Sequence, residues 1–183
     1  MFLDKAVYYT EDETSLFLRG GLSCPMLQPD QELDVVIRAD YSTLEGLWYT
    51  CRRVAQAVFD LFSQVQSGRM MPIPWFDIEE HEELFLPPCP LCGIYEDVRI
   101  PRTLEIVAVP QSCADEIYSH VAKAGEKFIV GDSRKFAVDR WAFLFSKLHP
   151  HLISQHGFFE GPGGPYRLAP ERLIPFLKTA QLL

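Results

Sequence analysis

The sequence predicts a single α+β domain over residues 1–183, in which a mostly antiparallel sheet packs against one long helix and shorter carboxy-terminal helices. Three observations support this class. Apolar residues recur every three or four positions from Leu44 to Val65, and short β-branched and aromatic runs lie on both sides of that stretch. Strands and helices then alternate too irregularly for a doubly wound sheet, while 48% hydrophobic residues suffice for one core.

The first elements are predicted to be strands. Residues 5–10 and 14–18 are rich in β-branched and aromatic side chains and are separated by the acidic turn EDE, which is typical of a hairpin. The run LDVVIRA, residues 33–39, is a third strand candidate for the same reason.

The long helix is predicted over about residues 42–66. Ser42 and Glu45 have the spacing of a capping box, and Gly68 follows the last turn as a left-handed stop. Cys51 lies on the apolar stripe of this helix, so we expect it to be a small core residue.

The second half of the chain predicts shorter elements. Residues 69–88 contain four prolines and an acidic cluster, which indicate an irregular connection. The later elements are expected in this order: a buried strand at 103–109, a helix from Ser112 to Gly125, a strand at 127–130, a helix from about 133 to Leu148, a turn-rich segment at 149–168, and a final helix from Pro170 that is kinked or ended near Pro175.

Composition and charge narrow the classes of function. A net charge of −8 argues against general nucleic-acid binding, which depends on clustered lysine and arginine, and it suits a basic protein partner. No apolar run reaches the length of a membrane span, and acidic residues interrupt the amino terminus, so we expect a cytoplasmic protein without a membrane partner. Five cysteines, an odd number, favour reduced thiols or metal binding over a disulfide framework.

The stretch PPCPLCG, residues 87–93, is the most specific motif. Its turn lets the thiolates of Cys89 and Cys92 reach one tetrahedral zinc ion, so zinc is a candidate cofactor. A closed site needs two more ligands. We favour Cys24 and His81 for these positions, and the other candidates are Cys113, His149, His151 and His156.

Two other interpretations are a redox pair at Cys89 and Cys92, and a metal-binding or general-base cluster of His149, His151 and His156. A redox pair would begin a helix after a strand, whereas Gly93 is followed by the extended, proline-limited IYEDVRIP. The HPH at 149–151 is typical of a polar turn.

No motif indicates catalysis. The chain has no G-x-S-x-G, no P-loop and no paired-carboxylate motif, and GPGGP at 161–165 reads as a turn. We therefore expect a protein that is not an enzyme. A hydrolase using a cysteine or histidine remains the alternative.

The acidic segment DIEEHEE, residues 77–83, follows two aromatic residues in the proline-bounded connection. It is either a solvated charged loop or an anionic surface with an aromatic anchor that binds a basic partner. The candidate partner-binding residues are Trp75, Phe76, Asp77, Glu79, Glu80, Glu82 and Glu83.

With these residues in view, PPCPLCG and the later segment SCADEIYSHVAKAGEKFIVGDSRKFAVDR resemble the carboxy-terminal part of the double-CXXCG motif proteins, a bacterial family prominent in myxobacteria. The family's first CXXCG is absent, and SCPML at 23–27 keeps only its Cys-Pro. The resemblance implies a bacterial immunity protein. We therefore expect a non-enzymatic binding protein that neutralises a toxin or effector through the acidic and aromatic surface; the alternative is a zinc-stabilised adaptor or regulatory protein that uses the CPLC turn.

Overall fold

The computed structural model describes residues 26–68, 75–82, 89–93, 102–109 and 141–183. Several predicted elements lie outside these described residues: the strands at 5–10, 14–18 and 127–130, and the helix from Ser112 to Gly125. Within the described part of the chain, no helix is both long and apolar enough to cross a membrane.

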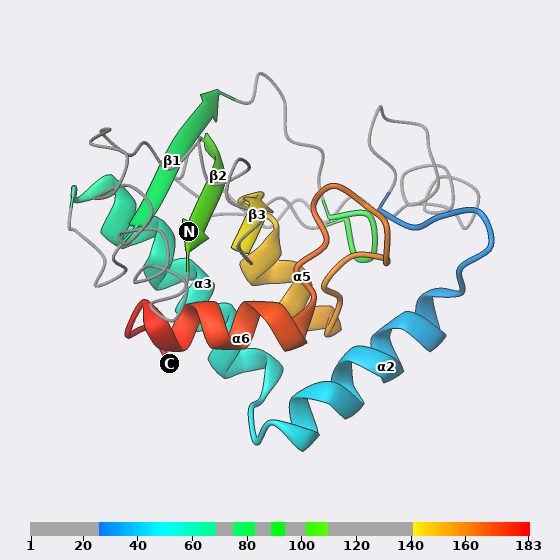
Figure 1. The fold of residues 1–183 in the computed structure, drawn as a ribbon. Helices are drawn as coiled ribbons and strands as arrows, with labels where there is room; N and C mark the ends of the chain where they lie inside the picture. The colour runs from blue at the N-terminus through cyan, green and yellow to red at the C-terminus, as the bar shows by residue number, and fades with distance from the viewer. Residues whose placement is uncertain (1–25, 69–74, 83–88, 94–101, 110–140) are drawn as a thin grey trace, which may run out of the picture.

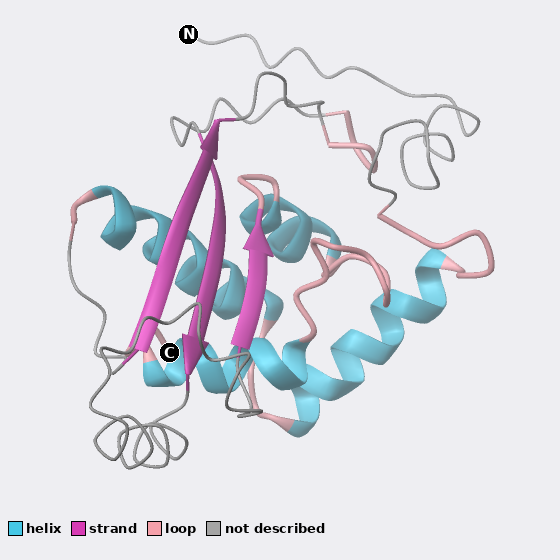
Figure 2. Ribbon diagram, turned by 45° about the horizontal axis from the view of Figure 1, so that its top comes forward, coloured by secondary structure: helices cyan, strands magenta, loops and turns pink. Residues whose placement is uncertain are grey.

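Three antiparallel strands form the sheet of the described residues, in the order β1-β2-β3 (Figure 2). They are β1 (Trp75–Glu82), β2 (Arg102–Val109) and β3 (Trp141–Phe145). Ile106 in β2 lies opposite Ile78 in β1 and Phe143 in β3. Leu104, Ile106 and Ala108 are buried while Glu105 is exposed, so the alternation of β2 gives the sheet one apolar face.

The helices of the described residues lie around this sheet, and aromatic side chains from two of them pack on its apolar face. The helices are α2 (Leu33–Gly46), α3 (Cys51–Gln66), α5 (His149–His156) and α6 (Pro170–Thr179), and Figure 1 shows their arrangement around the sheet. Phe62 of α3 meets Phe145 of β3 edge to face, with ring centroids 6.3 Å apart, and Phe176 of α6 lies 5.2 Å from Phe143. The main core is therefore formed by α3, α6 and the inner faces of β2 and β3.

A second, smaller apolar cluster lies beside the main core. Cys89 of the turn at residues 89–93 packs in it with Val36 of α2 and Leu152 of α5, so the cluster joins these three segments. Its buried residues are Leu27, Val36, Cys89, Leu148, Leu152 and Phe158. This cluster holds Cys89 close to the helix that begins at His149.

The predicted fold class is wrong in its balance of elements. Strands of 8, 8 and 5 residues accompany helices of 14, 16, 8 and 10 residues, so the described residues do not form a mostly antiparallel sheet packed against one long helix. Two of the differences come from residues 33–66.

The strand predicted at 33–39 is wrong, because these residues begin α2. The β-branched run favoured a strand, but Val36, Asp40 and Leu44 are the buried residues of α2 and recur every four positions. Burial of this stripe outweighs the weak strand propensity of the segment.

The predicted single helix over 42–66 is also wrong, because residues 47–50 are not helical and separate α2 from α3. The N-cap of α3 is Thr50, whose hydroxyl accepts a hydrogen bond from the backbone N–H of Arg53 at 3.3 Å, rather than Ser42. The apolar spacing continues across the break, which hides it in the sequence. Gly68 has the expected positive φ, 65°.

Three predictions for later segments were also wrong. Trp75–Glu82 is a strand rather than part of an irregular connection, and Trp141–Phe145 is β3 rather than helix. Residues 149–168 were predicted to be rich in turns, but their first part, His149–His156, is the helix α5. The strand at 103–109 is confirmed as β2, and the helix from Pro170 is confirmed as α6, which continues through Pro175.

Candidate metal centre

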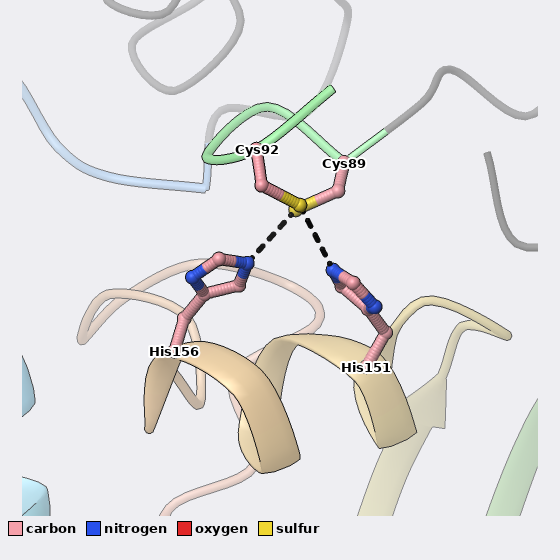
Figure 3. Close-up of side chains that lie close together, drawn as sticks. All are labelled: Cys89, Cys92, His151 and His156. Atoms are coloured by element: carbon pink, nitrogen blue, oxygen red, sulfur yellow. Dashed lines mark hydrogen bonds between the residues drawn. The ribbon is translucent and has the colours of Figure 1, made fainter. Parts of the chain in front are cut away.

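The CPLCG turn is closed by its own backbone. The N–H of Gly93 donates to the carbonyl of Cys89 at 2.7 Å, and Gly93 has a φ of 69°, a left-handed conformation that glycine adopts without strain. Leu91 and Cys92 pack against the small apolar cluster in which Cys89 is buried. The turn therefore presents both sulfurs toward α5 (Figure 3).

Helix α5 supplies two histidines. Pro150 lies in its first turn, where its missing N–H costs nothing, and Gly157 ends the helix with a φ of 63°. His151 and His156 are five positions apart, so their side chains leave the helix about 140° apart around its axis. Figure 3 shows the two rings reaching toward the sulfurs from either side.

The four side chains converge on one point. Cys89 Sγ lies 3.4 Å from His156 Nε2, and Cys92 Sγ lies 3.2 Å from His151 Nε2. One ligand atom from each residue lies within 4.8 Å of the other three. Among the described residues, no other group of cysteine, histidine and acidic side chains has this arrangement.

These distances match a tetrahedral ion. With Zn–S of about 2.3 Å and Zn–N of about 2.0–2.1 Å, the sulfur and nitrogen ligands of a tetrahedral zinc ion lie roughly 3.6 Å apart. The two sulfur–nitrogen distances, 3.4 and 3.2 Å, fall slightly short of this value. A small outward movement of the side chains accommodates the ion, so the four residues can hold a metal such as zinc.

Burial sets the protonation of two of these groups. Desolvation raises the pKa of the Cys89 thiol to about 11, so without a metal the thiol is protonated at neutral pH. Burial, and then the nearby His151, lower the pKa of His156 below 6.5, which keeps that imidazole in the neutral form that ligates metals.

The structure places half of the predicted ligand set at this site. Cys89 and Cys92 are there, whereas Cys24 lies outside the described residues, as does the other candidate Cys113. His81 is in β1, and the structure does not describe its side chain. The other two ligands are His151 and His156.

The prediction that HPH at 149–151 is a polar turn is wrong, because these residues begin α5. The spacing of His151 and His156 was the signal that could have identified them. Four residues lie between them, and three to five residues separate the histidines in typical two-cysteine, two-histidine zinc sites. A separation of 59 positions between Cys92 and His151 hid the connection.

The neighbouring His149 has a different role. Its Nδ1 accepts a hydrogen bond from the backbone N–H of Ser146 at 2.8 Å. Its Nε2 lies 3.2 Å from Glu160 Oε1 but outside hydrogen-bond geometry. Both side chains are buried, so His149 anchors the start of α5 and the loop after it.

The acidic residues predicted to bind a partner lie on a strand. Glu79 is opposite the exposed Glu105, whereas Glu80 is opposite the buried Leu104. Because successive strand positions face opposite sides, the acidic positions of β1 are divided between the two sides of the sheet. Glu83 lies outside the described residues.

Comparison with known proteins gives no relative: no protein-family model, no curated protein and no solved structure matches this chain. The resemblance to the double-CXXCG motif proteins therefore stays a prediction.

Proposed function

We propose that this protein binds one zinc ion through Cys89, Cys92, His151 and His156, and that the zinc is structural. The observation that carries the proposal is the convergence of four ligand atoms within 4.8 Å of one another. Two thiolates and two imidazoles in a tetrahedral arrangement form a donor set that suits zinc, whereas oxygen-rich sites suit magnesium and calcium.

A structural role follows from the number of ligands. Catalytic zinc sites keep one position open for water or substrate, whereas four protein ligands close the site. Cys89 and His156 are 67 positions apart, so the metal would cross-link two distant parts of the chain. The metal itself would then have no position at which to bind a substrate.

Metal analysis tests this proposal directly. The full chain, purified without a histidine tag, should contain about one equivalent of zinc by elemental analysis. Substitution by cobalt(II) should give the intense visible absorption of a tetrahedral site with thiolate ligands. His151→Ala and His156→Ala should each lower the zinc content, while Cys51→Ser should leave it unchanged, because Cys51 packs against the main core. Protein that neither contains zinc nor binds added zinc would overturn the proposal.

We further propose that the zinc-stabilised fold is a binding protein of immunity type, which neutralises a toxin or effector. The net charge of −8 favours a basic partner. In the described sheet β1 is an outer strand, and the positions of Asp77 and Glu79 share the side of Glu105, away from the core.

The immunity role has a separate test. The protein is used as bait in its source cells, and the captured partner is expressed with and without it. A partner that is toxic alone and harmless with the bait supports the role. Asp77→Asn with Glu79→Gln should weaken the complex. The control Glu32→Gln with Glu45→Gln removes two exposed charges, at the N-cap and in the last turn of α2, and should not. Equal affinity for all these proteins would contradict the proposed surface. Protein with zinc but without such a partner would favour the adaptor or regulatory alternative.

A further inference from the structure

We propose that the metal centre is redox-sensitive: oxidation joins Cys89 to Cys92 in a disulfide and releases the metal. This inference rests on the proposed zinc site. It assigns a second chemical state to the same two sulfurs, in which the turn is oxidised and the cross-link to α5 is absent.

The position of the sulfurs supports the disulfide. Both sulfur ligands come from one turn, and their ligand atoms lie within the 4.8 Å limit of the group. Figure 3 shows the two side chains pointing toward each other from the same loop. Only two residues separate the cysteines, so the turn can adjust locally to form the bond without moving a helix or strand.

Exposure gives the two thiolates different roles. Cys89 is fully buried, whereas Cys92 is half-buried, so a small oxidant reaches Cys92 first. Cys89 lies behind it as the resolving thiol, which is the usual arrangement at redox-sensing cysteine pairs. Cys51 is the third cysteine of the described residues, and it packs against the main core instead.

The reaction balances with hydrogen peroxide as the oxidant. The Cys92 thiolate attacks one peroxide oxygen: an S–O bond forms, the O–O bond breaks, and the hydroxide that leaves takes a proton to become water. The Cys89 thiolate then attacks the Cys92 sulfur. An S–S bond forms, the S–O bond breaks, and a second hydroxide leaves and is protonated to water. Each sulfur loses one electron, and peroxide accepts two.

Loss of the thiolates removes half of the ligand set. His151 and His156 remain on α5, and two imidazoles without thiolates hold zinc far less tightly than the full set of four ligands. The metal therefore leaves. Residues 89–93 keep only their apolar packing against Leu148 and Leu152 of the small cluster.

Zinc release measures this switch. The zinc-loaded full chain is treated with hydrogen peroxide, and released zinc is followed with a chromogenic chelator. Differential alkylation and peptide mass spectrometry identify the oxidised cysteines. We expect one equivalent of zinc to be released for each Cys89–Cys92 disulfide formed, and the zinc to rebind after reduction with dithiothreitol. Cys51→Ser should behave like the wild type.

The outcomes separate this inference from the zinc proposal. Protein that never binds zinc contradicts the proposed site itself. Protein that binds one equivalent but retains it under peroxide, with Cys89 and Cys92 still reduced, overturns only the redox inference. Release with sulfinic acid at Cys92, and without a disulfide, also overturns the inference, because that modification is not reversed by dithiothreitol.

Discussion

Trp48 adopts a backbone conformation that ordinarily favours glycine. Its φ is 62°, and it follows Leu47, the C-cap of α2; its N–H donates to the carbonyl of Glu45 at 3.0 Å. A left-handed residue at this position is a common helix stop, but it is usually glycine because a Cβ atom adds strain. Trp48 is 91% exposed, so little burial of its ring offsets that strain.

Replacement of Trp48 tests this strain. We expect Trp48→Gly to be more stable than Trp48→Ala by about 1 kcal/mol, because only the glycine variant removes the Cβ atom from the left-handed conformation. The larger entropy of glycine in the unfolded chain opposes the gain and limits its size. Urea denaturation of both variants gives the free energies of unfolding. Equal stability of the two variants would contradict strain at this residue.

Asp40 and Arg167 form an ion pair inside the fold. Asp40 is buried in α2, and the guanidinium of Arg167 donates to both of its carboxylate oxygens and to the carbonyl of Glu160. Desolvation raises the pKa of Asp40 above its ordinary value of 3.8, while its hydrogen bond and charge interaction with Arg167 act in the opposite direction. The pair therefore joins α2 to the loop before α6 and neutralises a buried charge.

Removal of Arg167 should destabilise the protein, because the carboxylate of Asp40 is then buried without a partner. We expect Arg167→Met to lower the free energy of unfolding at pH 7 by about 3–5 kcal/mol, because Asp40 then stays buried without a partner. Only desolvation and the charge of Glu171, which both raise the pKa of the carboxyl, then act on it, so its pKa in the folded state rises further. The folded protein binds a proton that the unfolded chain has released, and part of the loss should be recovered as the pH falls from 7 toward 5.

Urea denaturation at the two pH values measures this effect. The control is Asp40→Leu with Arg167→Met, which removes both charges and should recover much of the stability at pH 7. An Arg167→Met protein that loses more stability than the wild type on acidification would contradict the account.

At the scale of the element, the C-terminal end of α5 determines where the ligand His156 lies. Gly157 has a φ of 63°, and its N–H donates to the carbonyl of Ile153 while Phe158 N–H donates to Leu152, each at 3.1 Å. This termination directly follows His156 and fixes the direction of that ligand. A Cβ atom at Gly157 would meet Cys51 Sγ at 3.6 Å and Ile37 Cγ2 at 3.7 Å, which are ordinary contacts. The glycine is therefore needed for its backbone conformation.

We expect Gly157→Ala to destabilise the protein by about 1 kcal/mol, because alanine is strained at a positive φ. It should also weaken zinc binding, since the end of α5 positions His156. The matched control is Gly46→Ala near the end of α2, where a Cβ atom meets nothing within 4 Å and φ is not positive; it should be neutral or stabilising. Thermal unfolding and zinc titration of both variants measure these effects. Full zinc affinity in Gly157→Ala would contradict the positioning role.

The sequence predicted some elements well and others poorly, for physical reasons. β2 and α6 were predicted because a buried apolar run and a proline-initiated helix have strong local signals. α2 was mistaken for a strand because local propensity favoured one, and tertiary burial decided the outcome. The break at 47–50 was missed because the apolar spacing continues across it, although Leu47 and Trp48 are exposed.

At the scale of the whole molecule, the metal centre joins segments that the sequence keeps far apart. The CPLC half could be predicted, because two cysteines in one tight turn are a local signal. The histidine half could not be paired with it from the sequence. That pairing depends on the packing of residues 89–93 against α5, through Cys89, Leu148 and Leu152. The structure therefore supplies the pairing with α5. It does not test the two other ligands predicted from the sequence, because Cys24 and the side chain of His81 lie outside what it describes.

The same packing predicts how zinc affinity changes with pH. Without metal, burial holds the pKa of Cys89 at about 11, so zinc must displace a proton from this thiol at any pH near neutral. The pKa of His156 is lowered, so its imidazole is already neutral and releases no proton. Apparent zinc affinity should therefore rise at least about tenfold per pH unit between pH 7 and 8, one factor of ten for each proton released.

Competition with a chelator of known affinity, measured at several pH values, gives this slope. Calorimetry in buffers of different ionisation enthalpy counts the released protons independently. A conservative ligand change provides the control: Cys89→His replaces the high-pKa thiol with an imidazole, so any zinc binding that remains should depend less steeply on pH. Wild-type affinity that does not change from pH 7 to 8 would mean that Cys89 is not a ligand. The zinc would then be held elsewhere, because a buried thiol cannot bind zinc as thiolate without releasing its proton.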